Sequence, residues 1–190
     1  MMQILLHERD LLARKATLRE RFQRIFPGAP FIGADITSRS GGSAAIAVHQ
    51  GRTQSDYTTW RVRHDQTGLA ISYFEVWQYA KIGKGGGSLH GPCLVLKKAY
   101  LHLYRSEREE TEDGGKLFFF HCDPLVDHRY QAGPHLHAEC AGDPWSKKHI
   151  PLCDGFNEIV LKDIDSLDAA FDRIVDMIGA EFLSLTAGGA

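Results

Sequence analysis

The sequence has no long apolar run, no closely spaced cysteine pair and no excess of charge of either sign. A membrane-spanning helix needs roughly eighteen or more uncharged apolar residues, and no stretch of the chain is that long. The apolar start is interrupted at His7 and Glu8, which is too early for a secretory signal. The four cysteines form no CxxC pair. We therefore expect a reduced, cytoplasmic setting and no membrane partner.

The glycine-rich run 81–88 lacks the spacings of the common phosphate-binding loops. It contains neither GxxxxGK followed by Ser or Thr nor GxGxxG at the start of a helix. We interpret this run as a connection between strands.

The overall composition is that of an ordinary globular protein. The 190 residues carry 22 basic and 24 acidic side chains, a net charge of −2, and 43% are hydrophobic. At this length we expect a single domain over 1–190, with a core large enough to fold without disulfides.

Helical patterns occur at both ends of the chain. Apolar residues at steps of three and four predict an amphipathic helix over 5–26, which a Pro-Gly pair ends. A second stripe of this kind predicts a helix over 166–183, with Ser166 or Asp165 as its N-terminal cap.

The section between these helices, 31–140, is mainly β. Aromatic and β-branched residues dominate it and glycine-containing turns, such as that at Gly68, punctuate it. The expected strands are 31–37, 43–49, 57–64, 69–80, 93–105 and 116–122, the last two joined by an exposed hairpin over 106–115. These patterns predict an α+β fold: a curved antiparallel sheet of about six or seven strands with the N-terminal and C-terminal helices packed on one face.

The two ends of the chain differ in charge. Residues 1–24 hold six basic and three acidic side chains, whereas residues 154–190 hold two basic and eight acidic ones. The basic helix would either contact phosphates, pair with the acidic end or lie exposed, and we favour exposed, solvated faces.

Histidine is the one residue type whose distribution calls for a chemical explanation. Five of the ten lie in a short window: His121, His128, His135, His137 and His149. The other five are dispersed and are interpreted as hydrogen-bonded surface residues: His7, His49, His64, His90 and His102.

The segment 134–140, PHLHAEC, is the most informative part of that window. On an extended strand His135, His137 and Glu139 share one face, and Cys140 belongs to the other. His121 and Asp123 come at the end of the preceding aromatic strand, where we expect them at the rim of the sheet.

Three interpretations of this row of side chains remain open. It forms a polar outer face, or it holds a divalent metal such as zinc or manganese. The first candidate ligands of such a metal are His135, His137 and Asp123, and other candidates for the third ligand are Glu139, His121 and His149. Alternatively the two histidines act as general base and general acid in cleavage of an RNA phosphodiester, with His121 and Glu139 as auxiliaries.

RNA cleavage also needs cations for the phosphate and rings for the bases. The candidate substrate-binding residues of the window are Arg129, Tyr130, Lys147 and Lys148, with Arg61 and Arg105 as further cations and Phe120 and Trp145 as further stacking rings.

The order of these motifs resembles the toxin component of TumE-type toxin–antitoxin systems and related uncharacterised prokaryotic domains with a PHxH motif. The resemblance covers about 94–182 and is carried by residues 118–124, 134–137, 150–151 and the helix after 166. It implies a nucleic-acid-directed toxin or defence effector in which His135 and His137 are the functional positions.

Two functional hypotheses follow. The first is a toxin-like ribonuclease that acts on RNA through the His135–His137 pair. The second is a non-catalytic module that binds an antitoxin or another operon partner, which the net charge near zero favours because nucleic-acid binders are usually more basic. A histidine-triad nucleotide hydrolase fits less well, because Glu139 stands where that family has a third alternating histidine.

Overall fold

The computed structural model describes residues 3–26, 32–39, 42–51, 56–64, 68–80, 93–105, 116–123, 135–138, 148–151, 153–154, 157–158 and 163–178. For the strands between 135 and 158 it describes the backbone and its pairing. The glycine-rich run 81–88 and the connection 106–115 lie outside these residues.

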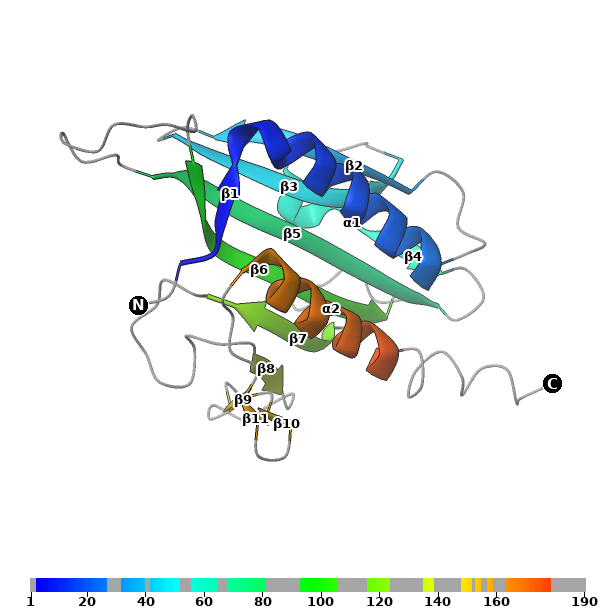
Figure 1. Cartoon of the computed structure of the whole chain (residues 1–190). Coiled ribbons are helices and arrows are strands. Elements are labelled where there is room, and N and C mark those ends of the chain that lie inside the picture. Colours follow the sequence, from blue (N-terminus) through cyan, green and yellow to red (C-terminus); the bar gives the residue numbers. More distant parts are fainter. Residues whose placement is uncertain are drawn as a thin grey trace.

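A curved antiparallel sheet is the centre of the fold (Figure 1). Its strands pair in the order β2-β3-β5-β6-β7-β8-β9, while β1 pairs with β6 and β4 with β5. Their bounds are β1 Leu5–His7, β2 Ile32–Arg39, β3 Ser43–Gln50, β4 Val62–His64, β5 Leu69–Tyr79, β6 Cys93–Arg105, β7 Lys116–Cys122, β8 His135–Ala138 and β9 Lys148–Pro151. The short strands β10, Cys153–Asp154, and β11, Asn157–Glu158, pair with each other.

Both helices cover the same face of this sheet (Figure 1). They are α1, Leu11–Ile25, and α2, Ile164–Ile178. Phe22 of α1 and Phe171 of α2 have ring centroids 5.6 Å apart, and Phe171 also packs edge-on against Tyr73 of β5 at 4.9 Å. The predicted α+β fold, with an antiparallel sheet and two helices on one face, is confirmed.

The prediction that the first helix begins at residue 5 is wrong. Residues 5–7 form β1 and Glu8–Asp10 form a 3₁₀ turn, η1, before α1 begins. Ile4 and Leu6 are buried whereas Leu5 is 53% exposed. This alternation has the period of a strand, and it sets β1 against β6.

The strand expected over 57–64 is shorter than predicted. Its first part is a 3₁₀ turn, η2, Tyr57–Thr59, because the Asp56 side chain accepts a hydrogen bond from the Thr58 amide and caps the turn. After β4 the chain turns back at Gly68, whose positive φ of 61° suits glycine.

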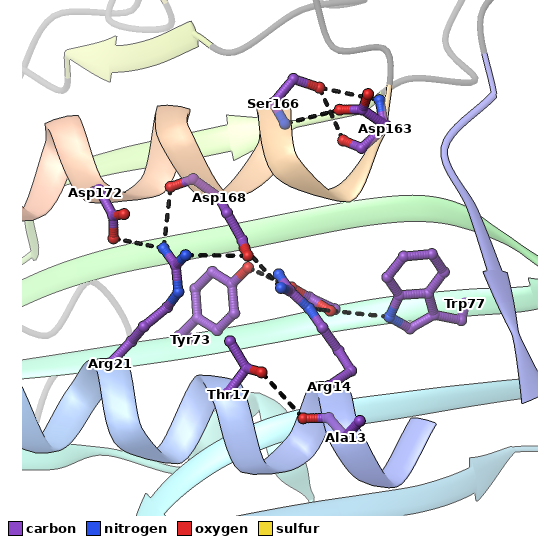
Figure 2. Close-up of polar contacts among 11 residues, drawn as sticks. Ala13, Arg14, Thr17, Arg21, Tyr73, Trp77, Asp163, Ser166, Asp168 and Asp172 are labelled. Atoms are coloured by element: carbon purple, nitrogen blue, oxygen red, sulfur yellow. Dashed lines mark hydrogen bonds and ion pairs between the residues drawn. The ribbon is translucent and has the colours of Figure 1, made fainter. Parts of the chain in front are cut away.

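A different residue from those expected caps α2. The Asp163 carboxylate accepts a hydrogen bond from the Ser166 amide at 2.9 Å, and the Ser166 hydroxyl in turn accepts one from the Asp163 amide at 3.0 Å (Figure 2). This reciprocal pair satisfies amide groups that the first helical turn leaves open. Residues after 178, where the prediction ended the helix at 183, lie outside the described part.

The opposite face of the sheet carries no α-helix among the described residues, only the single 3₁₀ turn η2. We call it the helix-free face. On it a smaller aromatic cluster joins η2 to β3 and β5, formed by Ala45, Ala47, Tyr57, Trp60, Phe74 and Val76, with Tyr100 packed against it.

Of the helices described, neither is long and apolar enough to cross a membrane.

Candidate functional site

Alternation along β6 and β7 places a row of aromatic and ionisable side chains on the helix-free face. In β6, the apolar residues 99, 101 and 103 enter the core beneath the helices, so Tyr100, His102 and Tyr104 belong to the other face. In β7, Phe120 and Cys122 enter the core in the same way. The positions left for the helix-free face are Phe119 and His121, with Asp123 next along the chain.

Two histidines from these neighbouring strands are in direct contact. The Nε2 atoms of His102 and His121 lie 2.9 Å apart, so the N–H of one ring donates a hydrogen bond to the nitrogen of the other. The Nδ1 atom of His102 lies 3.1 Å from the Tyr104 hydroxyl. Both histidines are half-buried. This is the pair of described imidazoles whose geometry suits proton transfer or metal ligation.

Tyr100 and Asp123 hold the ring of His121 in place. The Tyr100 ring stacks on His121 with centroids 3.7 Å apart and an interplanar angle of 12°. The Tyr100 hydroxyl donates to Asp123 Oδ1 at 2.8 Å. Burial raises the pKa of Tyr100 above its usual value, and the hydrogen bond and negative charge of Asp123 raise that pKa further. Tyr100 therefore stays protonated and keeps donating to Asp123 at neutral pH.

The strand register continues the row into the predicted histidine segment. His135 of β8 pairs with His121, and His137 pairs with Phe119 on one side and His149 on the other. Directly opposite residues of an antiparallel pair share a face of the sheet. The backbone thus brings His121, His135, His137 and His149, which are apart in sequence, to adjacent register positions.

The remaining candidates from the sequence are less well placed by the structure. Glu139, Arg129, Tyr130 and Lys147 lie outside the described residues, and Lys148 is described as the register partner of Ala138. Phe120, expected as a ring for base stacking, is fully buried in the core beneath the helices. That expectation is wrong, because Phe120 occupies an inward position of β7.

His102 is the residue that sequence reasoning missed. We interpreted it as a dispersed surface histidine, whereas it contacts His121 from the neighbouring strand. The signal was the sequence YLHLY at 100–104, in which Tyr, His and Tyr alternate with leucines and so share one face of a strand.

Among the described side chains, His102 and His121 are two nitrogen donors close enough together to be considered as metal ligands, but they are not a complete metal site. Within the described residues, no group of three or more His, Cys, Asp or Glu is arranged to hold a metal ion. Asp123, a predicted ligand, uses one carboxylate oxygen to accept the Tyr100 hydroxyl.

A second polar cluster lies between the helices and the sheet (Figure 2). Arg14 of α1 bonds the carboxylate of Glu75 in β5 through Nε, and its Nη1 donates to Asp168 of α2 at 2.6 Å. Arg21 of α1 pairs with Asp168 at 3.1 Å and with Asp172. The charged helices thus pair with each other, and our preference for two solvated faces is wrong.

This second cluster is structural in character. Arg14 is 4% exposed and Glu75 is fully buried, so a substrate has no direct access to either charge. The cluster instead ties α1, β5 and α2 together.

Comparison with known proteins finds no matching family model, no matching curated protein and no matching solved structure.

Proposed function

We propose that this chain is a toxin-like or defence-associated effector that cleaves RNA phosphodiester bonds on the helix-free face. His135 and His137 form its central pair, as the resemblance to TumE-type toxins implies. The observation that supports this proposal best is the 2.9 Å contact between His102 and His121, because His121 is also the register partner of His135. Three neighbouring strands, β6, β7 and β8, thus carry histidines at neighbouring positions of the sheet.

The chemistry follows from what imidazole does near neutral pH. A neutral imidazole removes the proton of a 2′-hydroxyl, and a protonated one donates to the leaving oxygen, so two histidines divide the work of one cleavage. The same nitrogens would serve as metal ligands in a metal-assisted version of the reaction. Arg129, Lys147 and Lys148 are the cations we assign to the phosphate.

Arg61 is a described cation of the same face. Its guanidinium carbon lies 4.2 Å from the centroid of the Tyr104 ring, and its Nη1 donates to the carbonyls of Thr58 and Trp60. These contacts hold a positive charge beside the His102–Tyr104 pair, where an RNA phosphate would gain from it.

The test is RNA cleavage by the purified chain and by the His135→Ala, His137→Ala double variant. We expect cleavage of single-stranded RNA by the native chain and a loss of at least about 100-fold in the double variant, within the range typical of acid–base residues. The matched control is His49→Ala, a histidine on β3 that contacts Trp60 and Asp35 away from the row. Undiminished cleavage by a folded double variant, checked by circular dichroism, would refute the proposal.

A non-catalytic role in binding an antitoxin or operon partner is the second candidate. The net charge of −2 favours it, as does the use of Arg14 and Arg21 within the molecule, because neither is then free to contact phosphates. Absence of RNA cleavage together with stable binding of the product of a neighbouring gene would support this role instead.

A further inference from the structure

We propose that His102 and His121 are two nitrogen ligands of a divalent transition-metal ion of the zinc class, bound on the helix-free face. Position 135 of β8 stands opposite His121 in the register of β7 and β8, and its histidine is the candidate that we propose for the third ligand. This ligand set differs from the one that the sequence suggested, since it begins with His102 and does not need Asp123. The inference does not require RNA to be the substrate, because metal binding is measured without any substrate.

The separation of the two nitrogens suits such an ion. At the usual Zn–N distance of about 2.0–2.1 Å, tetrahedral ligation places two nitrogens about 3.3 Å apart. The Nε2 atoms of His102 and His121 lie 2.9 Å apart. To bind one ion, both rings must turn so that the two nitrogens converge on it rather than face each other.

The surroundings of the two rings fit the second layer of a metal site. A ligating imidazole is neutral and passes its other ring N–H to an acceptor that fixes the tautomer. The Tyr104 hydroxyl, 3.1 Å from Nδ1 of His102, is such an acceptor. The ring of His121 is fixed by its stack on Tyr100, which Asp123 holds in turn. These contacts hold both rings, and His121 releases its Nε2 proton to solvent, or carries it on Nδ1, when the ion binds.

The ligand type selects the metal. Imidazole nitrogens suit zinc, cobalt, nickel and copper, whereas magnesium and calcium prefer oxygen ligands. The half-burial of His102 and His121 leaves the site shielded yet reachable from solvent. We therefore expect binding of Zn²⁺ and Co²⁺ and none of Mg²⁺ at comparable concentrations.

The experiment is a titration of the full chain, freed of metal with EDTA, with Zn²⁺ by calorimetry and with Co²⁺ by visible absorption. We expect one ion per chain and a loss of affinity of at least about 100-fold in His102→Ala and in His121→Ala, more than the 10–100-fold typical of a lost outer partner. Tyr104→Phe should lose about 10-fold, as such an outer partner. His49→Ala is the matched control and should bind as the native chain does.

A second measurement keeps the proposal testable if a variant fails to fold. In the native chain, Zn²⁺ should shift the Nε2 resonances of His102 and His121 in long-range ¹H–¹⁵N spectra and leave those of His49 unchanged. Absence of stoichiometric binding, or shifts at other histidines alone, would overturn the metal site.

The outcomes separate this inference from the proposed function. Zinc binding at His102 and His121 without RNA cleavage would uphold the metal site and refute the ribonuclease. RNA cleavage by a chain that binds no zinc, in the presence of EDTA, would uphold the ribonuclease and refute the metal site.

Discussion

Glu75 shows, at the scale of single residues, how this fold accommodates a buried charge. Its carboxylate is fully buried and accepts hydrogen bonds from the Tyr73 hydroxyl at 2.6 Å, from Trp77 Nε1 at 3.0 Å and from Arg14 Nε at 3.1 Å. Burial by itself lowers the pKa of Arg14, but the attraction of Glu75 raises it overall. Arg14 therefore keeps its positive charge beside this carboxylate.

Loss of one partner of that pair should be severe. We expect Arg14→Met to lower the free energy of unfolding by about 3–5 kcal/mol, because Glu75 is left as an uncompensated buried charge. Urea denaturation measures this change. Arg19→Met, at an exposed position of the same helix, is the matched control and should change the stability by less than about 0.5 kcal/mol. Equal effects of the two substitutions would contradict the role assigned to Arg14.

The link between Asp123 and Tyr100 makes a pH-dependent prediction. Asp123→Asn removes a negative charge that raises the pKa of Tyr100, so this pKa should fall towards its usual value near 10. A raised pKa in the folded state stabilises the fold below the pKa of the unfolded chain, and that stabilisation is lost as the pH rises through the folded value. As the pH rises through the alkaline range, ionisation of Tyr100 should therefore lower the free energy of unfolding of the variant less than that of the native chain.

The titration of Tyr100 is measured from the ¹³Cζ resonances of the tyrosines between neutral pH and strong alkali. Tyr79, whose hydroxyl donates to Glu8, serves as the internal control because Asp123 does not contact it. An unchanged midpoint for Tyr100 in Asp123→Asn would show that the carboxylate does not act on this ring.

At the scale of elements, the start of α2 depends on a local exchange of hydrogen bonds. Asp163→Ala removes the carboxylate that caps the Ser166 amide and should lower the free energy of unfolding by about 1 kcal/mol. Asp165→Ala is the matched control, since Asp165 is equally exposed and lies in the first turn. It should lose only a few tenths of a kcal/mol through the helix dipole. If Asp165→Ala lowered the free energy of unfolding more than Asp163→Ala does, Asp165 and not Asp163 would be the cap of α2.

The elements that the sequence predicts well are those with a strong local signal. The aromatic and β-branched residues between glycine-containing turns predict β5 and β6 almost to the residue, and the helical stripe that includes Phe171 predicts α2. β1 escapes prediction because three residues are too short to establish an alternation beside the longer helical pattern of α1. Its pairing with β6 is a tertiary contact that the local pattern does not encode.

At the scale of the whole molecule, the two faces of one sheet carry different kinds of side chain. The face under α1 and α2 holds the larger apolar core and the Arg14–Glu75–Asp168 cluster, which stabilise the fold. The helix-free face holds the His102–His121 pair, and the register of β7, β8 and β9 continues from His121 to His135 and from His137 to His149. The RNA cleavage that we propose would therefore take place on the helix-free face.

This division explains why the sequence predicts only part of the candidate site. The alternation of His135 and His137 is visible within four residues and was predicted. The contact of His102 with His121 depends on how β6 and β7 align across a connection of ten residues, and no local pattern fixes that register. Local patterns do not predict the contact between α1 and α2 either, because Arg14 and Asp168, which form it, are separated by most of the chain.

The most direct test of the functional assignment is where a single-stranded RNA binds. A 2′-O-methyl oligonucleotide, which lacks the hydroxyl that cleavage needs, is titrated into the native chain while the imidazole resonances of all the histidines are followed by long-range ¹H–¹⁵N spectra. We expect shifts at His102, His121, His135 and His137, with His7 and His49 unchanged. Shifts confined to His7 or His49, or no shift at saturating oligonucleotide, would contradict the functional assignment.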